Sequence, residues 1–180
     1  MMKKKVTAVM AATMLAASVG FAAPVNDLQQ HETAIGYNHY NLESGSIDMN
    51  NDSFYLENAL TDKLVLGIER NSYSMSGPLF DTTDIYAQYK LDPTFRLIVG
   101  NRNYSDGPNK MFYGVGATTA LAPRLDGYAS VTASSIATDW QVGAAYKLTS
   151  QASLNLGYKS YKEDGLPRAD GIGFGVNYTF

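Results

Sequence analysis

Apolar and polar residues alternate strictly through the last eleven residues of the chain. Five large apolar or aromatic residues occupy every second position, and glycine, asparagine and threonine fill the positions between them. Because the side chains of a β-strand point alternately to its two faces, this segment predicts a strand with one apolar face and one small, polar face. Such an apolar face requires an apolar solvent or a partner sheet. The residues on it are Ile172, Phe174, Val176, Tyr178 and Phe180.

The same alternation recurs along the chain and predicts ten strands. Four short turns of similar sequence, each starting with a leucine, follow one another at intervals of 31, 30 and 27 residues, which is the spacing of one hairpin plus the opposite connection. The predicted strands cover residues 33–42, 53–60, 64–73, 84–91, 95–104, 111–121, 125–134, 139–148, 152–162 and 170–180.

The connections between the repeated turns are expected to be longer and more polar. Short connections on one side and long ones on the other are typical of membrane β-barrels, with the short turns in the periplasm. We therefore predict an all-β fold: a single up-and-down antiparallel transmembrane β-barrel of ten strands with both chain ends periplasmic. Eight strands is the alternative, although it would discard one of the four similar turns. A soluble sandwich is a second alternative, in which the apolar face would pack inward.

The opposite face of the predicted strands collects charged residues and should line the lumen. A ten-stranded lumen is close to being filled by side chains, so a wide pore is not expected. These charges form either a structural network or the lining of a narrow, weakly selective channel, and charges in such a space must be paired or hydrated. The set is Glu57, Glu69, Asp84, Lys90, Arg96, Arg102, Asp126, Lys147 and Lys159.

Small residues line the predicted seam between the last strand and the first. Gly171, Gly173 and Gly175 should leave space in the lumen beside Gly36 and Asn38. We expect the open side of any pore along this seam, so that a Gly173→Trp substitution would narrow it.

Arg70 is an exception to the lumen pattern, because its position falls on the lipid-facing parity. Arginine in the middle of a membrane costs about 2–4 kcal/mol, but about 0–1 kcal/mol near the interface. Arg70 therefore lies either at the headgroup rim or at a β-bulge that turns it inward.

Residues 1–22 have the pattern of a cleaved export signal, with Lys3, Lys4 and Lys5 before an apolar run and small residues ahead of a cut after Ala22. Residues 23–30 show no periodicity and should form a short periplasmic tail, leaving residues 31–180 for the barrel. Removal of three of the 14 basic residues leaves 11 against 17 acidic ones, a net charge of -6. An acidic chain argues against nucleic acid as a partner, and the absence of cysteine excludes a thiol-based site.

Few residues suggest catalysis or metal binding. Of the two histidines, His31 precedes the first strand, and His39 lies toward lipid among aromatic residues, so no catalytic residue is assigned. Asp48, Asn50 and Asp52 have the first spacing of a calcium loop but lack its glycine and its final glutamate. No metal or other cofactor is expected. Acidic residues also occur in the outer connections and at the strand ends, and Asp139 is one of them. We expect these residues to form a solvated rim.

The closing strand resembles the C-terminal strand of bacterial outer-membrane β-barrels, in which a terminal Phe and alternating apolar residues form the signal for the barrel-insertion machinery. As an architecture, the chain resembles the small OmpA and OmpX type. The resemblance implies the cell outer membrane as location, periplasmic chaperones and the insertion machinery as partners, lipopolysaccharide and lipid as surroundings, and a monomer. It implies no activity. We expect a structural barrel or a narrow polar channel for small solutes or ions, and not an enzyme; the alternatives are a loop-mediated binding or adhesion protein and an outer-membrane lipid or peptide hydrolase.

Overall fold

The computed structural model describes residues 26–105 and 107–180 of the 180-residue chain. The predicted export signal and the first three residues of the predicted tail lie outside these ranges. None of the described residues belongs to a helix that is long and apolar enough to cross a membrane.

The described residues form ten β-strands, as the alternation predicted, and the eight-strand alternative is wrong. The strands are β1 (Thr33–Ser44), β2 (Ile47–Ala59), β3 (Leu64–Ser74), β4 (Pro78–Lys90), β5 (Phe95–Tyr104), β6 (Lys110–Ala122), β7 (Leu125–Ser134), β8 (Ala137–Lys147), β9 (Ala152–Glu163) and β10 (Ala169–Thr179).

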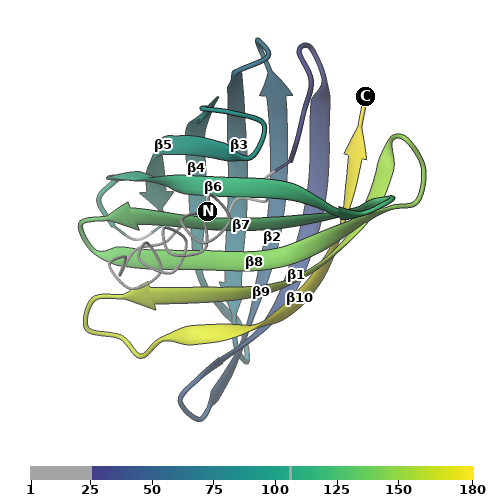
Figure 1. Cartoon of the computed structure of the whole chain (residues 1–180). Coiled ribbons are helices and arrows are strands. Elements are labelled where there is room, and N and C mark those ends of the chain that lie inside the picture. The colour runs from purple at the N-terminus through teal and green to yellow at the C-terminus, as the bar shows by residue number, and fades with distance from the viewer. Residues whose placement is uncertain (1–25, 106) are drawn as a thin grey trace, which may run out of the picture.

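Each strand pairs antiparallel with its neighbours in sequence, and β10 pairs with β1 to close the sheet into a barrel. The register at the closure places Ile35 opposite Tyr178 and His39 opposite Phe174. In the view of Figure 1, strands β6 to β9 cross strands β2 to β4, as the two walls of a barrel do. A closed sheet has no free edge, which satisfies every backbone hydrogen bond of the ladder without water. The sandwich alternative is therefore wrong.

The two faces of the sheet have opposite character. Large apolar side chains point outward on strands all around the barrel, for example Phe54 (63% exposed), Tyr113 (69%), Leu156 (63%) and Ile172 (63%). A soluble monomer rarely exposes an apolar patch of more than a few hundred Å². An apolar outside around a polar inside is the pattern of a barrel that spans a membrane.

The two ends of the barrel are named here by what they carry. The terminal end holds the start of β1, the end of β10 and the connections 60–63, 91–94, 123–124 and 148–151. The loop end holds the connections 45–46, 75–77, 105–109, 135–136 and 164–168. The predicted difference in length is wrong, because the connections have two to four residues at the terminal end and two to five at the loop end.

The strands run further toward the loop end than the alternation suggested. Ile47–Asp52 and Pro78–Thr83 continue β2 and β4, where connections were expected. The reason is that the backbone ladder does not require apolar side chains: Glu43 pairs with Asp48 and Asn41 with Asn50. Polar side chains on both faces mark where a strand leaves the apolar band, and not where it ends.

Candidate functional site

The lumen holds the charged residues that the sequence predicted, but they do not form one network. Each of the nine is buried inside the barrel or lines its mouth at the terminal end. The loop half contains Glu69, Asp84, Arg102 and Lys159; the terminal half contains Glu57, Lys90 and Arg96, with Asp126 and Lys147 at the mouth.

Arg102 is the centre of the loop half. Its guanidinium donates two hydrogen bonds to Asp84, from Nε (2.8 Å) and Nη2 (2.7 Å), and a third from Nη2 to Asp139 Oδ2 (3.0 Å). Asp84 and Asp139 are fully buried. Asp139 lies on β8, which is not a neighbour of β5 in the barrel, so Arg102 joins two separate parts of the wall. Two ion pairs around one planar group make this the strongest tie across the lumen.

The expectation that Asp139 belongs to an exposed acidic rim is wrong, because its side chain is buried in the lumen. It lies inside the predicted strand 139–148, on the parity opposite to Trp140 and Val142. The parity argument alone would have placed it in the lumen.

Lys159 is buried, and the acceptors of its hydrogen bonds are neutral. Its Nζ donates to Asn51 Oδ1 (2.8 Å) and Asn71 Oδ1 (3.0 Å), and it lies 5.4 Å from the ring centre of Tyr40 and 5.7 Å from that of Tyr73. Amide oxygens and aromatic faces both attract a cation. Because Lys159 lies on β9 and the two asparagines lie on β2 and β3, these contacts form a second tie across the lumen.

A third tie and an apolar layer complete the loop half. Tyr40 Oη donates to Gln141 Oε1 (3.2 Å), which links β1 to β8. Toward the loop end, Tyr40 and Tyr73 belong to a buried cluster with three apolar residues, against which Phe80 packs; the three are Leu42, Met49 and Ala169. The loop half is thus filled by side chains of the barrel itself.

In the terminal half, Glu57 and Arg96 bind neutral partners. Glu57 accepts hydrogen bonds from the Tyr86 hydroxyl (2.9 Å) and the Gln88 amide (2.6 Å). Arg96 donates to Thr118 Oγ1 (3.0 Å) and Gln88 Oε1 (3.3 Å). Amides and hydroxyls thus take the place of counterions around Glu57 and Arg96, whereas Lys90 pairs with Asp27 (3.1 Å) and Lys147 with Asp126 (2.7 Å).

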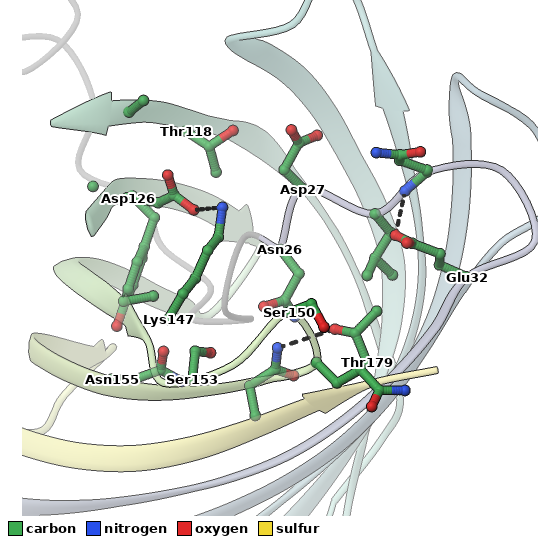
Figure 2. A pocket seen from close by; sticks show the side chains of 18 of the residues that line it. Asn26, Asp27, Glu32, Thr118, Asp126, Lys147, Ser150, Ser153, Asn155 and Thr179 are labelled. Atoms are coloured by element: carbon green, nitrogen blue, oxygen red, sulfur yellow. Dashed lines mark hydrogen bonds and ion pairs between the residues drawn. The ribbon is translucent and has the colours of Figure 1, made fainter. Parts of the chain in front are cut away.

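A cavity of about 540 Å³ opens at the terminal end. Asp126 and Lys147 line it and form an ion pair of 2.7 Å, with half of the lysine side chain exposed. In Figure 2 the Asp126–Lys147 pair lies at one side of the cavity, and Asn26 and Asp27 lie between it and Glu32 in this view. The segment 26–30, predicted to be a tail outside the barrel, contributes four of the residues that line the cavity.

Glycines of the lumen face are covered by aromatic rings from a neighbouring strand. A Cβ atom on Gly173 would lie 2.3 Å from the ring of Tyr40, and one on Gly36 would lie 2.2 Å from that of Tyr55. Each of these pairs is directly opposite in the sheet, and three further pairs repeat the arrangement: Gly67 with Tyr86, Gly100 with Phe112, and Gly143 with Tyr128.

The expectation of open space along the closing seam is wrong for this reason. The Tyr40 ring fills the space at Gly173, and Asn38 fills the space at Gly175, where a Cβ atom would lie 2.1 Å from Asn38 Oδ1. A residue without a side chain leaves room, but in a narrow lumen the residue opposite occupies that room.

On the outer face, His39 points away from the lumen, as its parity predicted. Its Nδ1 lies 2.8 Å from Asp52 Oδ1 and its Nε2 lies 3.3 Å from Asn41 Oδ1, while Tyr37 also donates to Asp52. The ring lies 5.7 Å from that of Phe174. One ring nitrogen therefore faces Asp52, which is opposite His39 on β2, and the other faces Asn41, two residues further along β1.

The strand register also shows the orientation of Arg70 and the location of the residues with calcium-loop spacing. Arg70 points outward and forms an ion pair with Asp81 (2.7 Å), so the bulge alternative is wrong at this position. Asp48 and Asn50 lie within β2 and not in a loop. In the ranges that the structure describes, no group of three or more His, Cys, Asp or Glu residues could hold a metal ion.

The fold and the two faces of the sheet define a transmembrane β-barrel. No model of a protein family matches the chain, and no curated protein matches it in sequence. The resemblance to the OmpA and OmpX type therefore remains a resemblance in architecture.

Among solved structures, the chain is similar to several outer-membrane barrels. The NanC porin has 8% identity and a TM-score of 0.49, with 80% of this chain and 98% of that chain covered. An outer-membrane channel from Pseudomonas putida F1 has 11% identity and a TM-score of 0.47, with 88% and 99% covered. The N-terminal β-barrel domain of Pseudomonas aeruginosa OprF has 15% identity and a TM-score of 0.45, with 85% and 100% covered. At these values the comparison assigns no activity to the chain.

Proposed function

We propose that the protein is an integral outer-membrane β-barrel with a structural role, whose lumen is closed. The observation that carries the proposal is Arg102, which joins Asp84 and Asp139 across the loop half while all three residues are buried. Lys159 and Tyr40 add two further ties between walls that are not adjacent. A solute would have to break charge-assisted hydrogen bonds in a site without water contact, and such bonds are costly to leave unmade.

The location and the partners follow from the sequence pattern and the outer face. A leader typical of export, a polar lumen and an apolar outside together fit the bacterial outer membrane. In this arrangement the terminal end faces the periplasm, and Ile172, Phe174, Val176, Tyr178 and Phe180 serve as the signal for the insertion machinery. All five point outward or lie exposed. Chaperones of the periplasm and lipopolysaccharide around a monomeric barrel complete the proposal.

A narrow polar channel is the second candidate. It is favoured by the cavity of about 540 Å³ at the terminal end, which is lined by polar residues and leads toward the lumen. Adhesion through long outer loops has less support, since the connections at the loop end have two to five residues. Hydrolysis through His39 would need a ring nitrogen that faces a nucleophile or a water, whereas its Nδ1 lies 2.8 Å from Asp52 Oδ1 and its Nε2 lies 3.3 Å from Asn41 Oδ1.

Conductance of the purified protein in planar lipid bilayers distinguishes the two candidates. We expect no steady single-channel steps from the unmodified protein, because the loop half is filled. Steady steps of uniform size would contradict the closed barrel and support the channel. Heat modifiability on a denaturing gel, in which unboiled and boiled protein migrate differently, serves as the control for a folded barrel.

A further inference from the structure

Residues 26–30 enter the mouth of the barrel at the terminal end. Leu28 is only 2% exposed and belongs to a buried cluster with Ala34, Ala59 and Val65. These three residues lie on the lumen face of β1, β2 and β3. Burial of a leucine in a matching apolar pocket fixes the position of the segment at one point.

Hydrogen bonds fix the segment at four more points. Asn26 Nδ2 donates to Glu57 Oε2 (2.7 Å), and Arg96 Nη1 donates to the carbonyl oxygen of Asn26 (2.7 Å). Lys90 Nζ donates to Asp27 Oδ1 (3.1 Å) and to the carbonyl oxygen of Leu28. Two main-chain carbonyls, one amide and one carboxylate therefore each have a partner supplied by the barrel.

The barrel groups that hold the segment come from strands that are fixed without it. Glu57 is held by Tyr86 and Gln88, and Arg96 by Gln88 and Thr118. The apolar pocket, Glu57 and Arg96 would thus remain in place if the segment left. The backbone of Lys90 is held in β4 by a hydrogen bond from its N–H to the carbonyl oxygen of Lys63 (2.8 Å), so its ammonium stays within reach of the mouth. The cavity of about 540 Å³ beside it, on the side of β6 to β10, provides room for the segment to leave and for another chain to enter.

We propose that the mouth at the terminal end is a peptide-binding site, and that residues 26–28 are its resident ligand. The site takes a peptide that carries an amide, an acidic side chain and a leucine at consecutive positions, because each of these groups has its own partner in the barrel. A flexible tail of another protein with this pattern would compete with the resident segment. The site does not depend on a closed lumen; only the compartment of the competing peptide rests on the proposed orientation.

The first test uses a barrel whose resident ligand has been removed. In a variant with Asn26→Gly, Asp27→Ser and Leu28→Gly, the mouth is vacant while the chain length is kept. The probe is a fluorescein-labelled peptide Asn-Asp-Leu-Gln-Gln, blocked at both ends, and its binding in detergent micelles is followed by fluorescence anisotropy. We expect saturable binding to this variant and weaker binding to the unmodified protein, in which the peptide has to displace the resident segment.

A matched peptide in which aspartate replaces the leucine tests the pocket. We expect it to bind about tenfold more weakly or worse, since a buried leucine side chain contributes at least that factor to affinity. Absence of binding to the folded variant, or equal binding of the two peptides, would overturn the proposal.

A second measurement applies to the full chain and does not need the triple variant to fold. The sequence has no cysteine, so single cysteines introduced as Leu28→Cys and Gln29→Cys can be labelled with a maleimide in the folded barrel. Leu28 is buried and Gln29 is exposed, and we expect labelling at position 28 to be at least tenfold slower. Addition of Lys90→Met should accelerate labelling at position 28 and leave position 29 unchanged. Equal rates at the two positions would show that the segment is not bound, whatever the conductance experiment gives.

Discussion

In the loop half of the lumen, residues from opposite walls meet directly; in the terminal half the walls stay apart, and a separate segment of chain lies between them. Arg102 reaches Asp139 and Lys159 reaches Asn51 and Asn71 in the first case. In the second, Arg96 reaches only Gln88 and Thr118 on neighbouring strands and the carbonyl of Asn26.

The difference lies in how each half compensates for buried charge. Arg102 has two carboxylates within hydrogen-bond distance, so its removal would leave two buried anions without a cation. Arg96 itself binds only carbonyl and hydroxyl oxygens. The buried carboxylate that its charge stabilises, Glu57, also accepts hydrogen bonds from Tyr86 and Gln88, which remain when Arg96 is removed. The loop half should therefore be rigid and sensitive to single substitutions, and the terminal half more tolerant.

The largest effect is expected at the two arginines. Arg102→Ala should lower the free energy of unfolding by about 3–5 kcal/mol, because Asp84 and Asp139 stay buried as uncompensated charges. Arg96→Ala should lower it by roughly 1–3 kcal/mol, since it removes hydrogen bonds to neutral groups. Urea unfolding of the refolded protein in lipid vesicles, followed by fluorescence, measures both.

A double variant separates lost charge balance from lost packing. Asp139→Asn in the Arg102→Ala background should recover part of the stability, because it removes one of the two unbalanced anions. Equal losses for Arg102→Ala and Arg96→Ala, or no recovery in the double variant, would show that the two halves do not differ in this way.

Much of the loop half could be predicted from the sequence, because strand parity decides which residues share the lumen. Parity placed Glu69, Asp84, Arg102 and Lys159 correctly, and applied to Asp139 it would have identified the acceptor across the barrel. It could not show which residues meet, since partners such as Lys159 and Asn51 lie on strands far apart in the sequence. That depends on the tilt and closure of the barrel, which no local pattern specifies.

The terminal half was less predictable for a different reason. Residues 26–30 have no periodicity, and a short aperiodic segment next to a predicted leader reads as a tail. The position of this segment depends on the packing of Leu28 against Ala34, Ala59 and Val65. Those three residues are unremarkable in the sequence, and they form a pocket only after the strands have paired.

Substitutions of two glycines, one in each half of the lumen, should lower the free energy of unfolding by intermediate amounts. Gly173→Ala would place Cβ 2.3 Å from the Tyr40 ring and 2.5 Å from the carbonyl oxygen of His39, so both a ring and the backbone stand in the way. Gly36→Ala meets within 2.4 Å only the outer part of the Tyr55 ring, next to the terminal half. We expect losses of about 2–3 kcal/mol for Gly173→Ala and about 1 kcal/mol for Gly36→Ala, within the usual range for overpacking.

The control for these variants is Gly77→Ala, because nothing lies within 4 Å of the Cβ position there. It should leave the unfolding midpoint nearly unchanged in the same urea titration. If Gly36→Ala proved as costly as Gly173→Ala, the terminal half would be packed as tightly as the loop half.

The smallest effect is expected for the Asp126–Lys147 ion pair at the terminal mouth. The distance of 2.7 Å equals that of Arg102 to Asp84, but the side chains are 31% and 53% exposed, against 0% and 5% for the loop-half pair. Water screens an exposed pair and competes for its hydrogen bonds, so its coupling energy should be at most about 1 kcal/mol. A double-mutant cycle with Asp126→Asn and Lys147→Met in urea titrations measures this coupling, and repeating it at high salt should reduce it further. A salt-independent coupling of several kcal/mol would mean that the mouth is as well shielded from water as the loop half, and would remove the distinction between the two halves of the lumen.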